Sequence, residues 1–403
     1  MAHAFIGTGQ CGTQIIDKMF MNKDMHLIAN PIAINSALED FKRLKNVSRE
    51  FWIGISKHEG AIEAVSEEGK LVAGFEGMVV GGFGGDPDKV EKVVSEHYNN
   101  FKNLLSKRIR KGSHADIRAK RERIASFAFL SVGLGGGTGS CIAPYVAQAI
   151  KEEFRDEDIP VVVVGVLPAK KEGSRTAWNA WRCLNKLYEH ADCFLLIDNE
   201  KIAYGDMNNL FWDYNFYVAR CLTDIIEGSV LERINPADYG INAQVMDVHD
   251  AISAMTIGYG NRKKPGFSAI SRVSKSTKSL LGYCLPKFMP LWKGISVRDM
   301  INDSLGSLTL DNINPKEAVK DYGALRIPPH YLKGKINSDE AYHVLGEYSN
   351  DPRFGISITK RNLASMTVIL TFDETLEKLK ELKSAAADYA KTHKKYFDDG
   401  VNI

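Results

Sequence analysis

Two glycine-rich stretches carry the residues of this sequence that are best suited to binding a charged ligand. The first, GTGQCG, places Gly7, Gly9 and Gly12 in the spacing G-x-G-x-x-G directly after a short apolar run. The second, GLGGGTGS, lies between an apolar run and a helical pattern. In such strand-to-helix turns the backbone N–H groups and the helix dipole attract an anion, so both stretches indicate phosphate binding.

The first stretch alone does not say which phosphate ligand is bound. A dinucleotide fold requires an acidic residue about twenty positions further on, at the end of the second strand. The sequence IAINSALED has Asn35 and Ser36 at that place. The pattern G-x-x-x-x-G-K-[ST] of P-loop proteins is absent as well. A dinucleotide-dependent oxidoreductase is therefore disfavoured.

The second stretch suits a di- or triphosphate. Its glycines surround one threonine, so several backbone N–H groups converge on one concave point, and two hydroxyls add further donors. A third stretch, VVGGFGGDP, also leads into a helical pattern. Three such loops in one domain predict a phosphate chain that is bound from several sides. The candidate residues of the second and third stretches are Gly135, Gly136, Gly137, Thr138, Gly139, Ser140, Gly84 and Gly85.

Apolar runs of strand length alternate with helical patterns in the first half of the sequence. Several runs are apolar on both faces, as expected for parallel strands under helices, and the alternation predicts a doubly wound parallel sheet. One long helical pattern covers 204–228, after which the alternation loosens. The predicted strands are 3–7, 27–35, 126–133, 159–167, 191–198 and 365–372, and the other predicted helices are 87–109, 140–154, 176–191 and 373–397.

The composition limits the function. A length of 403 residues suits two packed domains, and a net charge of +2 does not favour nucleic acid as the main partner. Six cysteines without a C-x-x-C pair indicate reduced thiols. No apolar run has the length of a membrane span, so we expect a soluble cytoplasmic protein. The basic stretch 107–125 is either a solvated helical insertion, which is favoured, or a contact for an acidic partner or membrane surface.

The motifs resemble those of one protein family. GGGTGS resembles the signature loop of the tubulin/FtsZ superfamily, and GQCGTQI is similar to the first nucleotide loop of tubulin. The resemblance runs from Ile6 to about Ile252. It implies a doubly wound α/β, Rossmann-like GTP-binding domain that a long central helix joins to a smaller α+β domain. The expected bounds are 1–205 for the GTP-binding domain, 206–229 for the helix, 230–385 for the second (activation) domain and 386–403 for a C-terminal helix and short end.

The resemblance also implies which residues contact GTP or GDP. The loop LPAKKEGSR is similar to the ribose loop of FtsZ and assigns Glu172 to the ribose, whereas the arginine of that pattern is displaced by one residue, to Arg175. LLIDNEKI and YGDMNNLFWDYNFYVARCL resemble tubulin. This resemblance assigns Asn199 to the guanine edge, Tyr204 to stacking on the base and Asn208 to a hydrogen bond with it. The first two loops contribute Gly9, Gln10, Cys11, Gln14 and Asn35.

A further loop, INAQVMDVHD, resembles the FtsZ sequence N-V-D-F-A-D, which in that family completes the active site of the next subunit in a filament. Asn242 matches the asparagine, Asp247 matches the second acid, and Gln244 replaces the first acid. The resemblance therefore implies hydrolysis through Asp247 with one negative charge fewer. The alternative is that Asp247 is only an acid at the N-terminus of a helix.

The function implied by the resemblance is that of a cytoskeletal GTPase. Such a protein polymerises head to tail with copies of itself and hydrolyses GTP, with Mg²⁺, at the subunit interface. The tubulin-like first loop, the FtsZ-like ribose loop and the lack of an acidic tail are most similar to the archaeal CetZ group, which implies control of cell shape. The alternative is a nucleotide-bound scaffold that does not hydrolyse, supported by Gln244 and by Cys141 where the family has glycine. Membrane association stays open.

Overall fold

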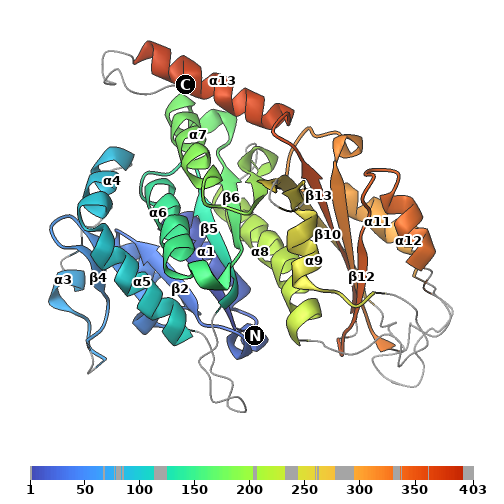
Figure 1. Ribbon diagram of the computed structural model, residues 1–403, viewed down its shortest axis with the longest axis horizontal. Coiled ribbons are helices and arrows are strands. Elements are labelled where there is room, and N and C mark those ends of the chain that lie inside the picture. The colour runs from blue at the N-terminus through green and yellow to red at the C-terminus, as the bar shows by residue number, and fades with distance from the viewer. Residues whose placement is uncertain are drawn as a thin grey trace. The chain divides into compact units, whose positions relative to one another are not determined.

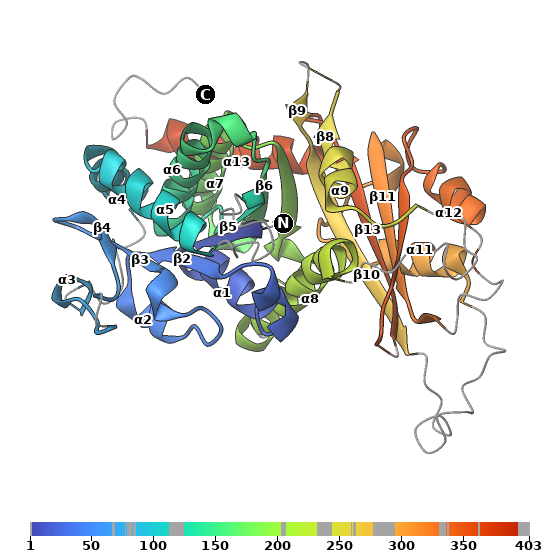
Figure 2. The same ribbon diagram turned by 60° about the horizontal axis from the view of Figure 1, so that its bottom comes forward.

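Apolar runs of strand length become β-strands in both of the two units into which the chain divides (Figures 1 and 2). The first unit comprises 1–219 together with 377–403, and the second comprises 220–376. From the sequence, we expect the second domain to continue to residue 385. The computed structural model describes residues 2–66, 69–76, 78, 83, 86–112, 125–202, 207–231, 244–258, 260, 263–276, 295–329, 336, 338–361 and 363–393.

The sheet of the first unit has the strand order β7-β6-β5-β1-β2-β3-β4. Neighbouring strands are parallel except β3 and β4, which are antiparallel. Every residue of β6 is buried, as expected for a parallel strand that helices cover on both faces. The predicted doubly wound parallel sheet is therefore confirmed. The strands are β1 (Ala2–Thr8), β2 (Pro31–Asn35), β3 (Trp52–Ser56), β4 (Gly60–Glu63), β5 (Ala125–Gly133), β6 (Val161–Leu167) and β7 (Cys193–Asp198).

Helices cover both faces of this sheet. Figure 2 shows α4, α5, α6 and α7 over one face and α1 and α2 over the other. The last helix, α13, packs on α7 through Trp178, Ala386 and Ala390. The predicted helix 87–109 is instead two helices, because His97 leaves the helical conformation with φ −112° and ψ 24°. The helices are α1 (Gly9–Met19), α2 (Leu38–Lys42), α3 (Ala73–Glu76), α4 (Pro87–Glu96), α5 (Tyr98–Gly112), α6 (Thr138–Glu153), α7 (Ser174–Tyr188) and α13 (Glu377–Thr392).

The second unit contains a sheet in the order β12-β11-β13-β10, in which β13 is antiparallel to both of its neighbours. Figure 2 shows α9 on one face of this sheet and α11 and α12 on the other. The sequence indicated β13 alone, because the other strands bury polar side chains, and the buried Ser268 Oγ lies 2.8 Å from Thr371 Oγ1. The elements are α9 (Val248–Ala254), β8 (Thr256–Ile257), β9 (Lys264–Pro265), β10 (Phe267–Ser276), α11 (Val297–Leu305), β11 (Lys320–Ile327), α12 (Ser338–Leu345), β12 (Phe354–Ile358) and β13 (Leu363–Phe372).

Helix α8 (Met207–Ile226) crosses the boundary of the units, and its last turns are fixed by buried ion pairs. Asp224 Oδ2 lies 2.6 Å from Arg272 Nε, and Asp224 Oδ1 lies 2.6 Å from Arg326 Nη1. Arg326 Nη1 also lies 2.7 Å from Glu227 Oε2. Burial alone would raise the pKa of Asp224, but Arg326 and Arg272 outweigh it and hold that pKa below its ordinary value.

Short helical turns lie between these elements. The 3-10 turns are Lys23–Leu27, Arg49–Phe51, Arg155–Glu157, Lys170–Glu172, Asn199–Ile202 and Pro315–Glu317, and Glu227–Leu231 is a π-helical turn. Within the described ranges, no helix is both long and apolar enough to cross a membrane.

Candidate functional site

The first two predicted glycine stretches meet where β1 and β5 end. Gly9 has a φ of +66°, and a Cβ atom on it would lie 2.8 Å from Cα of Gly139. A Cβ on Gly139 would lie 2.7 Å from the carbonyl oxygen of Thr8. Only glycine permits this approach. It places the N-termini of α1 and α6 beside each other, so their dipoles give this corner of the sheet a positive potential.

The loop after β2 adds the hydroxyl of Ser36 to the same corner. Ser36 Oγ lies 2.8 Å from Thr138 Oγ1 at the start of α6. The Asn35 side chain is buried and fixes its own loop, because its Oδ1 accepts a hydrogen bond from Ser36 N (2.8 Å) and its Nδ2 donates to Asp40 Oδ2 (3.0 Å). The structure therefore brings the second predicted loop against the GGGTGS loop.

The GGGTGS loop is held by side-chain hydrogen bonds from two helices. The Ser140 hydroxyl in α6 donates to the carbonyl oxygen of Gly136. Asn179 Nδ2 in α7 donates to the carbonyl oxygen of Gly135 at 3.3 Å. Ser140 thus shapes the loop from inside, and its predicted contact with phosphate stays a prediction.

The predicted ribose residue Glu172 and one of the predicted base residues, Asn199, come together at the ends of β6 and β7. These strands are parallel neighbours with Leu167 opposite Asp198, so the turns that follow them lie side by side. Asn199 Nδ2 donates to Glu172 Oε1 at 3.2 Å, and Ala169 N donates to the same oxygen at 2.8 Å. Ligands of open parallel sheets bind at this carboxyl edge.

Cys11 links the first glycine loop to this pair. Burial, and next the carboxylate of Glu172, raise the pKa of the Cys11 thiol to about 12. A Cβ on Gly133 would lie 2.8 Å from Cys11 Cβ, so the thiol side chain lies against the end of β5. Cys11 is therefore a neutral filler beside the loops. On the same helix, Gln10 is exposed and Gln14 is half-buried.

Part of the predicted set of site residues lies outside the described residues: Gly84, Gly85, Tyr204, Asn242 and the side chain of Asn208.

The residues that directly follow the third glycine stretch are described. Asp86 caps α4 by accepting from Asp88 N at 3.1 Å, and the Cys141 thiol in α6 donates to the carbonyl oxygen of Pro87 at 2.8 Å. Cys141 therefore ties the start of α4 to the helix that follows the GGGTGS loop, a contact that sequence reasoning missed.

The predicted catalytic segment lies in the second unit. Ile356 N in β12 donates to the Gln244 carbonyl oxygen at 2.9 Å, and Met246 N donates to the Ile356 carbonyl oxygen at 3.1 Å. Asp247 is exposed and caps α9, because its Oδ1 accepts from His249 N at 2.9 Å. The capping interaction that the sequence left as an alternative is therefore present. This capping bond occupies one of the two carboxylate oxygens of Asp247.

Asp250 is a member of this segment that sequence reasoning did not single out. Gln244 Nε2 donates to Asp250 Oδ2 at 3.0 Å. Burial and the neighbouring Asp247 raise the pKa of Asp250 above its ordinary value, against the opposing effect of Arg353. The signal in the sequence is the spacing, since Asp250 follows Asp247 by three residues and shares its helix face.

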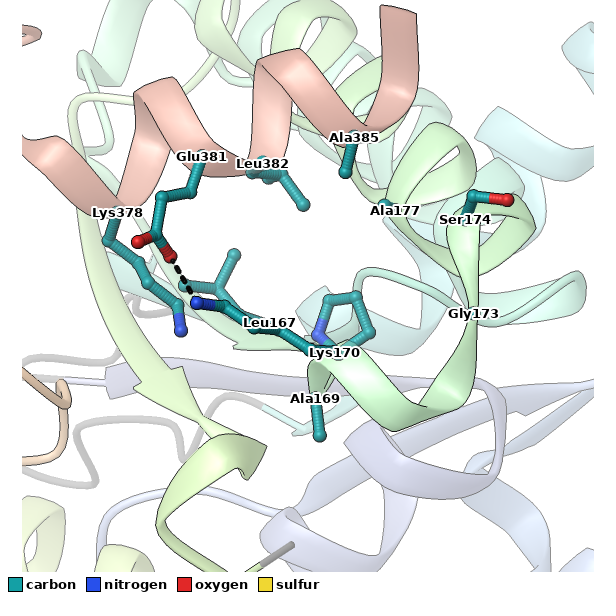
Figure 3. A pocket seen from close by; sticks show the side chains of 11 residues that line it. Leu167, Ala169, Lys170, Gly173, Ser174, Ala177, Lys378, Glu381, Leu382 and Ala385 are labelled. Atoms are coloured by element: carbon teal, nitrogen blue, oxygen red, sulfur yellow. Dashed lines mark ion pairs between the residues drawn. The ribbon is translucent and has the colours of Figure 1, made fainter. Parts of the chain in front are cut away.

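A pocket of about 270 Å³ adjoins the ribose loop in the first unit (Figure 3). Its floor is the segment after β6, and its opposite wall is α13. Its lining residues are Leu167, Pro168, Ala169, Lys170, Gly173, Ser174, Ala177, Lys378, Glu381, Leu382 and Ala385.

Glycine loops at helix N-termini and a carboxylate–amide pair at the carboxyl edge of a parallel sheet define a nucleotide-binding domain. The profile described as tubulin/FtsZ family, GTPase domain, matches residues 3–204. The protein belongs to this family, and its first unit contains the GTPase domain.

The protein is similar to archaeal tubulin-like CetZ proteins. That of Pyrococcus horikoshii is 26% identical over 361 residues, which cover 87% of this chain and 78% of the relative. That of Thermococcus kodakarensis is 28% identical over 233 residues, which cover 56% of this chain and 50% of the relative. The chain thus aligns with only half of the second relative.

Solved structures of CetZ proteins share the fold. CetZ from Methanosaeta thermophila superposes with a TM-score of 0.69 at 22% identity over 98% of this chain and 93% of that chain. The GTPγS-bound protofilament of CetZ2 from Haloferax volcanii gives a TM-score of 0.67 at 20% identity over 97% of this chain and all of that chain.

Proposed function

We propose that this protein binds GTP at the carboxyl edge of its first sheet, polymerises head to tail with further copies of itself, and hydrolyses GTP at the contact between copies. The observation that carries the proposal is the pairing of Asn199 with Glu172 at this edge. Residue types suited to phosphate, ribose and base thus belong to loops that end at one edge of one sheet.

Each loop has a separate task in this proposal. The N–H groups of the GGGTGS loop and the dipoles of α1 and α6 bind the phosphates. Glu172 accepts hydrogen bonds from the ribose hydroxyls. Asn199, together with Tyr204 and Asn208, recognises guanine, because an amide offers a donor and an acceptor and an aromatic ring offers a stacking surface.

Mg²⁺ is expected with the triphosphate, where it neutralises charge on the phosphate oxygens. Among the described residues, no group of three or more His, Cys, Asp or Glu side chains offers a metal site. The hydroxyls of Thr138 and Ser36 are oxygen donors of a kind that Mg²⁺ accepts. These residues fit a cation that is held mainly by phosphate oxygens and water.

Hydrolysis requires a water molecule in line with the γ-phosphate, and catalysis is mostly positioning and electrostatics. We assign that positioning to Asp247, with Gln244 and Asn242, from a neighbouring copy. Asp247 is exposed and retains one carboxylate oxygen beyond its capping bond. A head-to-tail contact does not close on itself and propagates as a filament. The filament proposal is supported by CetZ2, a relative of this fold solved as a GTPγS-bound protofilament.

The cellular part of the proposal is a cytoplasmic filament that controls cell shape, and its support is the similarity to the CetZ proteins. Phosphate release from GTP, measured against protein concentration with Mg²⁺, tests the biochemical part. Specific activity should rise above a threshold concentration at which filaments become visible by negative-stain electron microscopy. Activity that is independent of concentration would refute hydrolysis at a contact between copies.

A second candidate is a nucleotide-bound scaffold that does not hydrolyse. The observation that favours it is the capping bond of Asp247, which gives this acid a structural task, together with the loss of an acid at Gln244. Tight GTP binding with neither turnover nor filaments at any concentration would establish the scaffold instead.

A further inference from the structure

Helix α13 contacts both turns that carry the proposed ribose and base residues. Lys378 Nζ lies 2.6 Å from Asp198 Oδ2, at the end of β7. Lys170 Nζ, in the turn after β6, lies 3.1 Å from Glu381 Oε2. Figure 3 shows Lys378 and Glu381 on the face of α13 that is turned toward the Lys170 segment. One helix face therefore makes one ion pair with each turn.

The position of Lys378 is unusual for a lysine. It is the second residue of α13, where the positive end of the helix dipole disfavours a cation. Its side chain is also only 12% exposed, whereas lysines are seldom buried without a partner. Pairing with Asp198 explains both features.

Asp198 is equally unusual, because it is fully buried. Its Oδ1 accepts a hydrogen bond from Glu200 N at 3.0 Å, and its Oδ2 faces Lys378. A buried carboxylate is tolerated only when both charge and hydrogen bonds are compensated. Without Lys378, the Asp198 side chain would be driven toward water or protonation, and the turn that begins at Asn199 would shift with it.

The same contacts continue into the proposed nucleotide site. Asn199 lies between Asp198 and Glu200 in the chain, and its amide donates to Glu172 Oε1 at 3.2 Å. The Glu200 carboxylate accepts from Lys170 N at 2.7 Å. The two turns are therefore bonded to each other, and α13 is bonded to both.

One ion pair, between Lys170 and Glu381, joins α13 to the Lys170 segment. The pocket of about 270 Å³ separates the helix from the backbone of the segment, as Figure 3 shows. The apolar packing of α13 on α7 involves residues further along the helix, namely Trp178, Ala386 and Ala390. Removing an ion pair should therefore alter the turns more than it alters the packing of the helix.

We propose that Lys378 is a positioning residue of the nucleotide site, which through Asp198 holds Asn199 in place for recognition of the base. Glu381 supports the adjacent ribose turn through Lys170. The proposal rests on the proposed function, since it assumes that Asn199 contacts a nucleotide. Helix α13 then supports the turns of the nucleotide site without itself contacting the nucleotide.

The test compares the binding of two nucleotides, GDP and IDP, which differ by the 2-amino group of the base, by isothermal titration calorimetry. The full-length variants are Lys378→Met, Lys378→Arg and Glu381→Gln, with Lys380→Met as the control. Lys380 lies on the same helix, is exposed, and pairs only with the exposed Glu377 at 3.2 Å among the contacts described, so it matches the charge change. Melting temperatures are measured on the same samples.

Lys378→Met is expected to weaken GDP binding about tenfold, which corresponds to about 1.4 kcal/mol, and to weaken IDP binding less. Lys378→Arg should restore most of the preference for guanine, and Lys380→Met should match the wild type. Glu381→Gln should weaken both nucleotides by a similar small factor, because it acts on the ribose turn.

The results distinguish the positioning role of Lys378 from the proposed nucleotide binding on which it rests. A purely structural role of Lys378 would lower the melting temperature and leave the ratio of the two affinities unchanged, which would overturn the positioning role. Should Lys378→Met fail to fold, the polar variant Lys378→Gln decides, and an unchanged ratio of the two affinities in that variant would also overturn the positioning role. A wild-type protein that binds neither nucleotide would overturn the proposed function, and the positioning role with it.

Discussion

Glu172 offers the sharpest test of the proposed nucleotide contacts, because two substitutions remove different parts of its role. Glu172→Gln keeps one oxygen that can accept from Ala169 N (2.8 Å) and Asn199 Nδ2 (3.2 Å), and it removes the charge and replaces the second oxygen by an amide NH2. Glu172→Ala removes the charge and leaves both donors without their acceptor.

The expected losses follow from the hydrogen bonds. A hydrogen bond to a charged group contributes about 1.5–3 kcal/mol and a neutral one about 1 kcal/mol, so Glu172→Gln should weaken GDP binding by about 1.4 kcal/mol, or about tenfold. Glu172→Ala loses the whole ribose contact and loosens the turn that holds Asn199. The sum is about 3–4 kcal/mol, or a loss of several hundredfold.

Isothermal titration calorimetry with unmodified GDP measures both variants, because its ribose hydroxyls are free to contact Glu172. Glu189→Gln is the matched control, because Glu189 is an exposed carboxylate at the other end of α7. The order of affinities should be wild type, then Glu172→Gln, then Glu172→Ala. Equal affinities for the two Glu172 variants would show that the hydrogen bonds to Ala169 and Asn199 do not matter. Unchanged affinity in both would refute the ribose assignment.

Three further predictions concern the second unit. Asp224→Asn should lower the free energy of unfolding by about 3–5 kcal/mol, because it removes the buried carboxylate that pairs with both Arg272 and Arg326. Since the folded pKa of Asp224 is lowered, its contribution is present above the unfolded pKa and is lost as pH falls, so urea unfolding of the two proteins should converge in acid. Burial raises the pKa of Asp321 to about 7, so its contribution to stability is complete below its ordinary pKa of 3.8 and is lost as pH rises to about 7. Asp321→Asn should therefore gain stability relative to the wild type between pH 4 and 7, and a constant difference across this range would contradict the burial argument. Asp250→Asn should lower kcat about tenfold and leave the GDP affinity unchanged, because the Gln244 amide loses its charged partner. A loss of GDP affinity as large as the loss of kcat would contradict a role confined to turnover.

The parts of the fold that the sequence revealed are those whose residues obey local rules. Strands buried on both faces, such as β6, are continuous apolar runs, and the glycine loops carry their own spacing. The strands β10, β11 and β12 were not recognised, because buried polar side chains interrupt their apolar pattern. These residues are Ser268 and Ser271 in β10, Lys320, Asp321 and Arg326 in β11, and Ser357 in β12. The break between α4 and α5 at His97 has neither glycine nor proline to mark it.

The candidate site likewise contains residues that the sequence revealed and residues that it did not. Glu172 and Asn199 were found through motifs that resemble a family, and the register of β6 and β7 supplies the reason that they meet. The pairing of Lys378 with Asp198 was not predictable, because it joins segments far apart in the chain and Lys378 belongs to no motif. A lysine in the first turn of a helix is the one local sign that it has a specific partner.

The central claim is that one copy supplies the nucleotide and the next supplies Asp247, and mixing two defective variants tests it most directly. Glu172→Ala binds nucleotide poorly and retains Asp247, whereas Asp247→Ala binds nucleotide and lacks the acid. Phosphate release is measured for each variant alone and for an equal mixture at the same total concentration. Each variant alone should be nearly inactive, and random head-to-tail contacts should give the mixture about a quarter of the wild-type rate. A mixture no more active than the mean of its two components would contradict an active site shared between copies.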